Sequence, residues 1–278
     1  MNTLLRFPGG RAKALTLSYD DGVQSDIRLI EIMNAHGLKG TFNLNGGIFA
    51  PEGTVYPAGT IHRRMSKSDA LACFADDGME VAIHGYTHPF LEQLPDSMLA
   101  YEILRDRAEL ENLFGRIIRG CAYPFGTFND RVVDSLRNAG IVYARTTVAT
   151  GKFDIPHDWL RLPATCHHNN ARLMELAQNF IENKPSNSPW LLYLWGHSYE
   201  FDHDNNWGVM EDFASAIAGN DDIWHATNIE IYDYIAAYNA LQFSTGGTII
   251  HNPSALDVWF DCQRSEPIKV AAGEIKIL

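Results

Sequence analysis

Short apolar runs alternate with amphipathic stretches along most of this 278-residue chain. The apolar runs are typical of buried strands, and the stretches between them carry apolar residues at helical spacing. Strands that alternate with helices of about 10 to 18 residues indicate parallel β-α units. Roughly seven or eight such units favour a closed or nearly closed barrel over an open sheet. The sequence therefore predicts an α/β protein with a (β/α) barrel over residues 1–241.

The predicted elements follow one another with clear stop signals. Strands are expected at 15–19, 40–45, 79–85, up to Pro124, 141–146, 190–197 and 223–228, and helices at 25–36, 68–77, 96–114, 131–138, 170–181, 207–218 and 229–241. After Leu241 the helical period stops, and short strand-like runs are joined by Gly, Pro and Ser. We expect a small β-hairpin appendage over 242–278. The long loop 45–66 is a candidate rim for a substrate site.

Composition limits the classes of partner. Lys and Arg total 22 against 34 Asp and Glu, which gives a formal net charge of −12, and the chain has no long basic run. Such a chain repels phosphate backbones and anionic lipid, so neither nucleic acid nor a membrane surface is an expected partner. The N-terminal stretch lacks the apolar core of a signal peptide, and a cytoplasmic location is expected. The oligomeric state stays open.

Polar side chains gather where the predicted strands end. Asp20 and Asp21 follow the first strand in "LTLSYDDG", and His84 and His88 follow a later one in "HGYTHP". "YPFG" and "WGHSYE" come after two further strands. Because the carboxyl ends of parallel strands meet at one rim, we expect these clusters to form one shared site.

The two histidines favour a metal site. The zinc-protease pattern H-E-x-x-H is excluded because Gly85 stands where the glutamate should be, and Gly85 and Pro89 favour a loop. Two imidazoles with one carboxylate still form a three-ligand set for a catalytic zinc, with Asp20 or Asp21 as the third ligand. The other aspartate is then free to act as a base, since a bound cation lowers the pKa of water to about 7.

These motifs resemble those of the polysaccharide deacetylases, carbohydrate esterase family 4. "TLSYDDG" resembles T-F-D-D-G, and "HGYTHP" resembles the H-[ST]-x-x-H metal motif. The resemblance implies a distorted barrel of seven strands. It also implies that Asp20 is the base and that Asp21, His84 and His88 are the metal ligands.

Two weaker matches complete the resemblance. "AYPFG" is similar to R-x-P-Y-G, which implies that the backbone N–H of Phe125 stabilises the oxyanion and that Tyr123 and Pro124 contact substrate. "LYLWGHS" is similar to L-x-L-H-D. By that match His197 is the general acid, and Leu194 and Trp195 line the pocket for the acetyl methyl group.

Three departures stand beside the matches. Ala122 occupies the position of the family's arginine, which orients the base, and Arg161 is a candidate substitute. Ser198 replaces the aspartate after the final histidine. The motif that supports this histidine has only a loose match, "HDW" at 157–159.

The predicted function is a metal-dependent hydrolase that removes acetyl groups from N-acetylated amino sugars or oligosaccharides. Zinc is the expected ion, and cobalt, nickel or manganese would also suit the ligands. Two alternatives stay open: a catalytically silent carbohydrate-binding module on the same fold, or a deacylase of a non-sugar amide or an O-acetyl ester. The simplest interpretation of the remaining polar residues near these motifs is a solvated surface: His167, His168, Glu200, Asp202 and Asp204.

Overall fold

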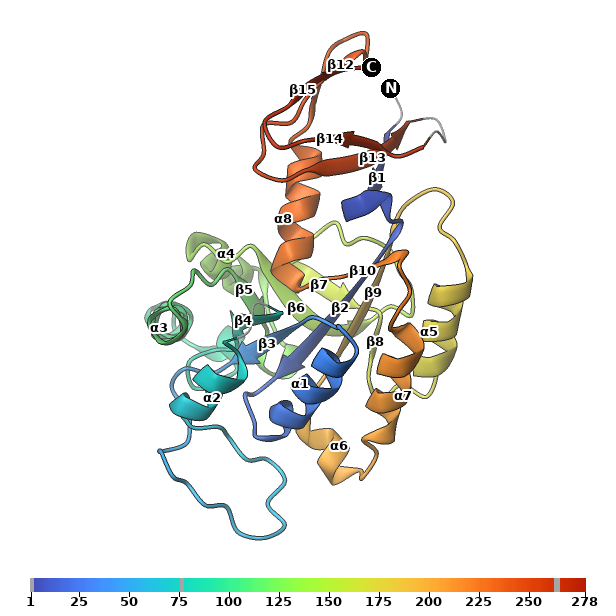
Figure 1. Ribbon diagram of the computed structural model, residues 1–278. Helices are drawn as coiled ribbons and strands as arrows, with labels where there is room; N and C mark the ends of the chain where they lie inside the picture. The colour runs from blue at the N-terminus through green and yellow to red at the C-terminus, as the bar shows by residue number, and fades with distance from the viewer. Residues whose placement is uncertain (1–2, 76–77, 263–265) are drawn as a thin grey trace.

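A parallel sheet forms the centre of the protein in the computed structural model, which describes residues 3–75, 78–262 and 266–278 (Figure 1). The strand order is β7-β6-β5-β4-β3-β2-β9-β8, and β10 pairs with the first half of β2. The strands of this sheet are β2 (Lys13–Asp20), β3 (Gly40–Leu44), β4 (Met79–Ile83), β5 (Gly120–Ala122), β6 (Tyr143–Ala149), β7 (Leu162–Ala164), β8 (Cys166–His167), β9 (Trp190–Gly196) and β10 (Ile223–His225). The α/β prediction is confirmed.

One short segment, residues 162–167, links the two ends of this sheet. Its first half, β7, pairs with β6, and its second half, β8, pairs with β9. Pro163 has no N–H to donate, and between the two halves Thr165 donates its N–H to the carbonyl of Tyr193. The architecture is therefore the predicted distorted (β/α) barrel. The path through the sheet has eight strands where seven were predicted, because this segment is divided into two short strands.

Helices form the outer layer around the sheet (Figure 1). They are α1 (Ser25–Ala35), α2 (Lys67–Cys73), α3 (Asp96–Phe114), α4 (Asp130–Asn138), α5 (Leu173–Glu182), α6 (Tyr199–His203), α7 (Gly208–Ile217) and α8 (Asn228–Asn239), with short 3-10 turns at Pro8–Gly10, Leu91–Gln93, Pro124–Gly126 and Trp159–Arg161. Local sequence defines several ends. Ser66 and Thr227 form capping boxes that begin α2 and α8, and Gly115 ends α3 in the left-handed conformation.

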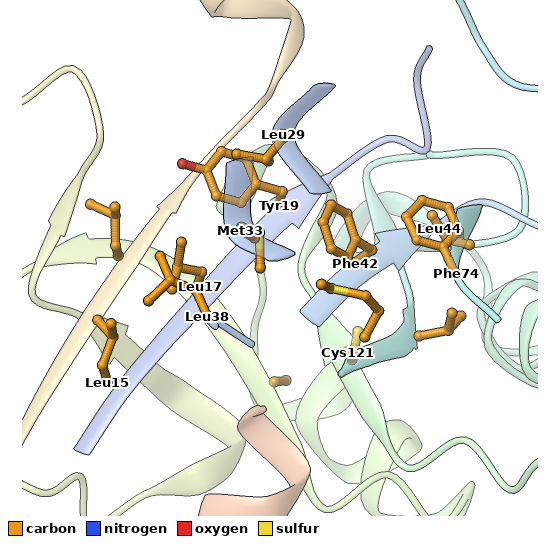
Figure 2. Close-up of a cluster of buried hydrophobic side chains, with 14 of the residues drawn as sticks. Leu15, Leu17, Tyr19, Leu29, Met33, Leu38, Phe42, Leu44, Phe74 and Cys121 are labelled. Atoms are coloured by element: carbon orange, nitrogen blue, oxygen red, sulfur yellow. The ribbon is translucent and has the colours of Figure 1, made fainter. Parts of the chain in front are cut away.

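The central strand β2 is buried on both faces, although its sequence KALTLSYD alternates large apolar residues with small or polar ones. Leu15, Leu17 and Tyr19 face outward and pack with α1 side chains (Figure 2). The alternate residues face the barrel interior, where Thr16 donates a hydrogen bond to Asn228 at 2.8 Å. Asp20 belongs to this inner set, because side chains alternate along a strand.

Two small antiparallel sheets lie at one end of the molecule, near both ends of the chain (Figure 1). One contains β1 (Thr3–Arg6), β13 (Val258–Cys262) and β14 (Ile268–Val270), and the other β11 (Gln242–Phe243), β12 (Ile249–His251) and β15 (Ile275–Ile277). The N-terminal strand thus pairs with the C-terminal region, and a domain boundary at 241 stays a prediction. Long loop 45–66 and α6 lie at the opposite end in Figure 1. In the described part of the chain, no helix has the length and apolar character needed to cross a bilayer.

Candidate active site

The turn after β2 separates the two neighbouring aspartates. Asp20 is the last residue of the strand, whereas Asp21 has a φ of 86° and Gly22 a φ of 63°. Aspartate tolerates this left-handed region better than most residues do. The Asp21 N–H donates to the carbonyl of Asn43 at 3.0 Å, which fixes the turn to the neighbouring strand. The two carboxylates therefore have different neighbours.

Asp20 is a buried base candidate with strong partners. Arg145 donates from Nη2 to both carboxylate oxygens, and Asn43 Nδ2 donates to Oδ1 at 2.8 Å. Burial by itself would raise the pKa of Asp20, but the Arg145 guanidinium, together with His84 and His197, outweighs this effect and lowers the pKa below its ordinary value. Asp20 is therefore held as an oriented carboxylate.

Arg145 supplies the guanidinium that the third motif lacks. It lies on β6 and is the register partner of Ala122 on β5, so both side chains are directed to the same face of the sheet. The Arg161 hypothesis is wrong: Arg161 pairs with Asp158 and Asp130 at the surface. Sequence analysis missed Arg145, although an arginine inside a predicted buried strand was a usable signal, because buried charges are normally paired.

Asp21, His84 and His88 form a candidate metal site, called here the metal-ligating group, whose possible ligand atoms all lie within 4.8 Å of one another. The Nδ1–H of His84 donates to the carbonyl of Ala122 at 2.8 Å, which leaves a lone pair on Nε2. That Nε2 lies 3.2 Å from His88 Nε2. Burial, and then the nearby His84, lower the pKa of His88 to about 4. Both imidazoles are therefore neutral near pH 7, so these three residues fit a divalent cation.

Helix α3 holds the loop that carries both histidines. Asp106 is fully buried and accepts hydrogen bonds from the N–H of His84 at 3.0 Å and of Gly46 at 2.6 Å. Glu102 accepts hydrogen bonds from the N–H and the hydroxyl of Thr87. Sequence analysis placed this helix but gave these two acids no role. They act on backbone groups, which no side-chain spacing shows.

The predicted rim loop reaches the site through two side chains. Arg64 donates to Asp21 Oδ1 at 3.0 Å and to Asn45 Oδ1 at 2.5 Å, and it also binds the Asp21 carbonyl. His62 Nε2 lies 3.3 Å from Asp21 Oδ2. Burial would raise the pKa of Asp21, but the bond to His62 and the charges nearby lower it well below its ordinary range. Loop 45–66 thus borders the metal-ligating group.

A second group lies on the other side of Asp20, with His197 as its inner member. His197 Nε2 is 3.7 Å from Asp20 Oδ2, and its Nδ1–H donates to Glu200 Oε1 at 3.1 Å. His167 and His168 approach the other oxygen of Glu200, at 3.2 and 2.9 Å. The solvated-surface interpretation is therefore wrong for His168, which is buried, and for Glu200, which has three imidazole neighbours.

The residues of the third motif follow β5 and lie in different surroundings. Phe125 has a φ of 59°, and its ring contacts that of His88 at 4.4 Å, so its backbone lies beside the metal-ligating group. Pro124 packs beside Gly85. The predicted substrate contact of Tyr123 needs correction, because this side chain is buried in the outer core and donates its hydroxyl to the Leu160 carbonyl.

Leu194 and Trp195 are successive residues of β9, so their side chains lie on opposite faces of the sheet. Leu194 is the register partner of Leu17 and packs in the outer core, which corrects its predicted place in the acetyl pocket. Trp195 pairs with Ser18 on the inner face, and its ring lies 4.4 Å from the Arg145 guanidinium and 5.8 Å from His197. Of these two residues, Trp195 is therefore the one that lies beside Arg145 and His197.

Comparison with known proteins found a family match and a shared fold. The family model for polysaccharide deacetylase matches residues 8–144. No curated protein matches the chain. A family 4 carbohydrate esterase from Streptomyces lividans, solved with acetate, has 19% identity and a TM-score of 0.50, covering 77% of this chain and 92% of its own.

Two further solved structures share the fold. A provisionally identified polysaccharide deacetylase from Mycobacterium smegmatis has 15% identity and a TM-score of 0.58, with 85% of this chain and 94% of its own covered. A mutant of a CE4 family pseudoenzyme from Bacillus anthracis, with restored enzymatic activity, has 17% identity and a TM-score of 0.50, with 82% and 69% covered. At these identities the likeness concerns the fold.

Proposed function

Residues 8–144 place this chain in the polysaccharide deacetylase family, and on that premise we propose that it hydrolyses the N-acetyl group of amino sugars or their oligosaccharides. The products are acetate and a free amine. The observation that carries the proposal is the position of one carboxylate oxygen. Asp20 Oδ2 lies 3.8 Å from His84 Nε2 and 3.7 Å from His197 Nε2, between the metal-ligating group and the candidate acid.

Asp21, His84 and His88 would hold the divalent ion, and we propose zinc because two imidazoles and a carboxylate suit it. When bound, such an ion polarises a carbonyl group and lowers the pKa of water. Cobalt, nickel or manganese would be accepted by the same ligands. The carbonyl of Ala122 fixes the tautomer of His84 for this task.

The chain's own groups move the protons. Asp20, oriented by Arg145, accepts a proton from the attacking water. The backbone N–H of Phe125 donates to the oxyanion that forms. His197 then protonates the departing nitrogen through Nε2, since an amide anion is too basic to leave without a proton. Trp195 borders the space for the acetyl methyl group.

A catalytically silent carbohydrate-binding module is the second candidate, favoured by Ala122 and Ser198. Against it stands Arg145, which restores the orientation of the base from the neighbouring strand. A silent module has no need of an oriented base or of a paired acid. A third candidate, a deacylase of non-sugar amides or O-acetyl esters, uses the same residues and differs only in the substrate.

The test is acetate release from a panel of N-acetylated sugars, oligosaccharides, simple amides and O-acetyl esters, with the metal content of the protein measured in parallel. We expect the wild type to release acetate from N-acetylated sugars. We expect Asp20→Asn to lose turnover while retaining its metal, and the exposed Asp134→Asn on α4 to behave as the wild type. Metal loss in Asp20→Asn would show that the two aspartates have exchanged roles, and no release from any N-acetyl substrate would contradict the function.

A further inference from the structure

Glu200 joins two parts of the chain through its two oxygens. It lies in the first turn of α6, three residues after His197, and Oε1 accepts the bond from His197 Nδ1 at 3.1 Å. Oε2 lies 3.2 Å from His167 Nε2, 2.9 Å from His168 Nε2 and 3.4 Å from Asn169 Nδ2. One oxygen thus accepts a hydrogen bond from His197, while the other faces His167 at the end of β8 and the two residues that follow it.

The packing around His168 shows that this arrangement is built into the fold. The imidazole is 1% exposed and lies between the rings of Tyr19, at 5.7 Å, and Phe201, at 4.1 Å. A Cβ on Gly196 would lie 2.0 Å from His168 Nδ1. The glycine before His197 therefore leaves the space in which His168 supports the carboxylate.

Hydrogen-bond partners distinguish this group from a metal site, although the ligand atoms of His167, His197 and Glu200 also lie within 4.8 Å of one another. The N–H of Asn169 donates to His167 Nδ1 at 3.1 Å. His167 Nδ1 is therefore unprotonated, and Nε2 of the neutral ring carries the proton and faces Glu200 as a donor. A nitrogen in that state has no lone pair for a cation.

Charged and aromatic groups surround His197. Glu200 lies on its Nδ1 side and Asp20 on its Nε2 side, the charge of Asp21 also acts on it, and the rings of His167 and Tyr199 lie 6.3 and 5.2 Å away. His168 lies behind Glu200, and the charge of Arg145 is directed at Asp20. Burial would lower the pKa of His197, but the bond to Glu200 and the charge of Asp20 raise it above its ordinary value.

We propose that Glu200, supported by His167 and His168, is the positioning residue that fixes the ring of His197 and keeps its Nε2 proton in place for the leaving nitrogen. The inference rests on the proposed function, because it gives the proposed acid its partner. Glu200 takes the place left by Ser198, which instead donates its hydroxyl to Asp26 at 2.5 Å.

Two readouts test the role of Glu200 in the metal-loaded protein. The first is titration of the His197 ring by NMR with ¹⁵N-labelled histidine, which requires no turnover. We expect Glu200→Gln to lower the pH at which His197 loses its proton by about 1 unit. Glu211→Gln, on the exposed face of α7, is the control and should leave the titration unchanged.

The second readout compares substrates. With Glu200→Gln we expect kcat on an N-acetyl sugar to fall about 10- to 100-fold, and kcat on an aryl acetate, whose leaving group needs little acid help, to fall less than about 3-fold. The alkaline limb of the kcat profile should move to lower pH, because the protonated form of His197 is the active one. Glu200→Asp keeps the charge and should recover part of the loss.

Each result has a defined meaning. An unchanged His197 titration, or equal losses on both substrates, would overturn the positioning role. Two zinc ions per wild-type chain that fall to one in Glu200→Gln would also overturn it and identify a second metal site. If Glu200→Gln shifts the His197 titration but the wild type releases no acetate, the proposed function is contradicted while the role of Glu200 in holding the proton stands.

Discussion

Two histidine groups flank Asp20, and they differ in the group that accepts the hydrogen bond from the Nδ1–H of the histidine nearest to Asp20. In His84 the Nδ1–H donates to the carbonyl of Ala122, whereas in His197 it donates to the carboxylate of Glu200. A neutral carbonyl leaves the ring neutral with a free lone pair, while a carboxylate favours the imidazolium. The same side chain is thus prepared to bind a metal on one side of the base and to carry a proton on the other.

Removal of a metal ligand should have the largest effect on turnover and on metal content. We expect His84→Ala to lose the bound ion and to reduce turnover more than about 10³-fold, because the polarising charge is lost with the ion. Metal analysis and acetate release measure both effects. His203→Ala, exposed on α6, is the matched control. Full metal content with normal turnover in His84→Ala would show that the group of Asp21, His84 and His88 has only a structural role.

Substitutions at Arg145 test whether an arginine on β5 can orient Asp20 as well as the arginine on β6 does. Arg145→Met leaves the buried carboxylate of Asp20 without its main charge partner, and we expect a loss of about 3–5 kcal/mol in stability together with a large fall in kcat. Denaturant unfolding and kinetics measure these losses. The double variant Ala122→Arg with Arg145→Ala returns the arginine to the register partner, and recovery of activity is expected. No recovery would show that the two positions are not equivalent.

A substitution at Gly196 tests the packing of His168 and Glu200 by steric hindrance alone. Gly196→Ala places a Cβ against the His168 ring, so we expect about 1–3 kcal/mol of destabilisation and a selective loss of activity on amides. Gly208→Ala is the control, because a Cβ there has no atom within 4 Å. Equal behaviour of the two variants in thermal unfolding would mean that the His168 packing is not needed.

The smallest effect is expected on the outer face of the sheet. Tyr123→Phe removes one hydrogen bond to the Leu160 carbonyl, which is worth about 1 kcal/mol of stability, and kcat should stay within about 2-fold of the wild type. Trp195→Phe on the inner face should instead raise KM or lower kcat. A kinetic defect in Tyr123→Phe that exceeds the one in Trp195→Phe would contradict the assignment of faces.

Sequence analysis predicted most of the fold because alternating strands and helices have strong periodicity. It brought together Asp20, Asp21, His84 and His88 because each pair is local in sequence and lies at the carboxyl end of a strand, where parallel strands meet. Tyr123 and Leu194 were misplaced, since a motif match does not show which face of a strand a side chain takes. Arg145 and Glu200 were missed as partners, because pairing across strands and between loops depends on tertiary register.

The central claim is that the divalent ion belongs to Asp21, His84 and His88 and not to the group around Glu200. The most direct test is an anomalous difference map at the zinc edge from crystals grown with zinc. We predict one peak among the carboxylate of Asp21 and the Nε2 atoms of His84 and His88. A peak among His167, His197 and Glu200, with none at the first group, would contradict the account.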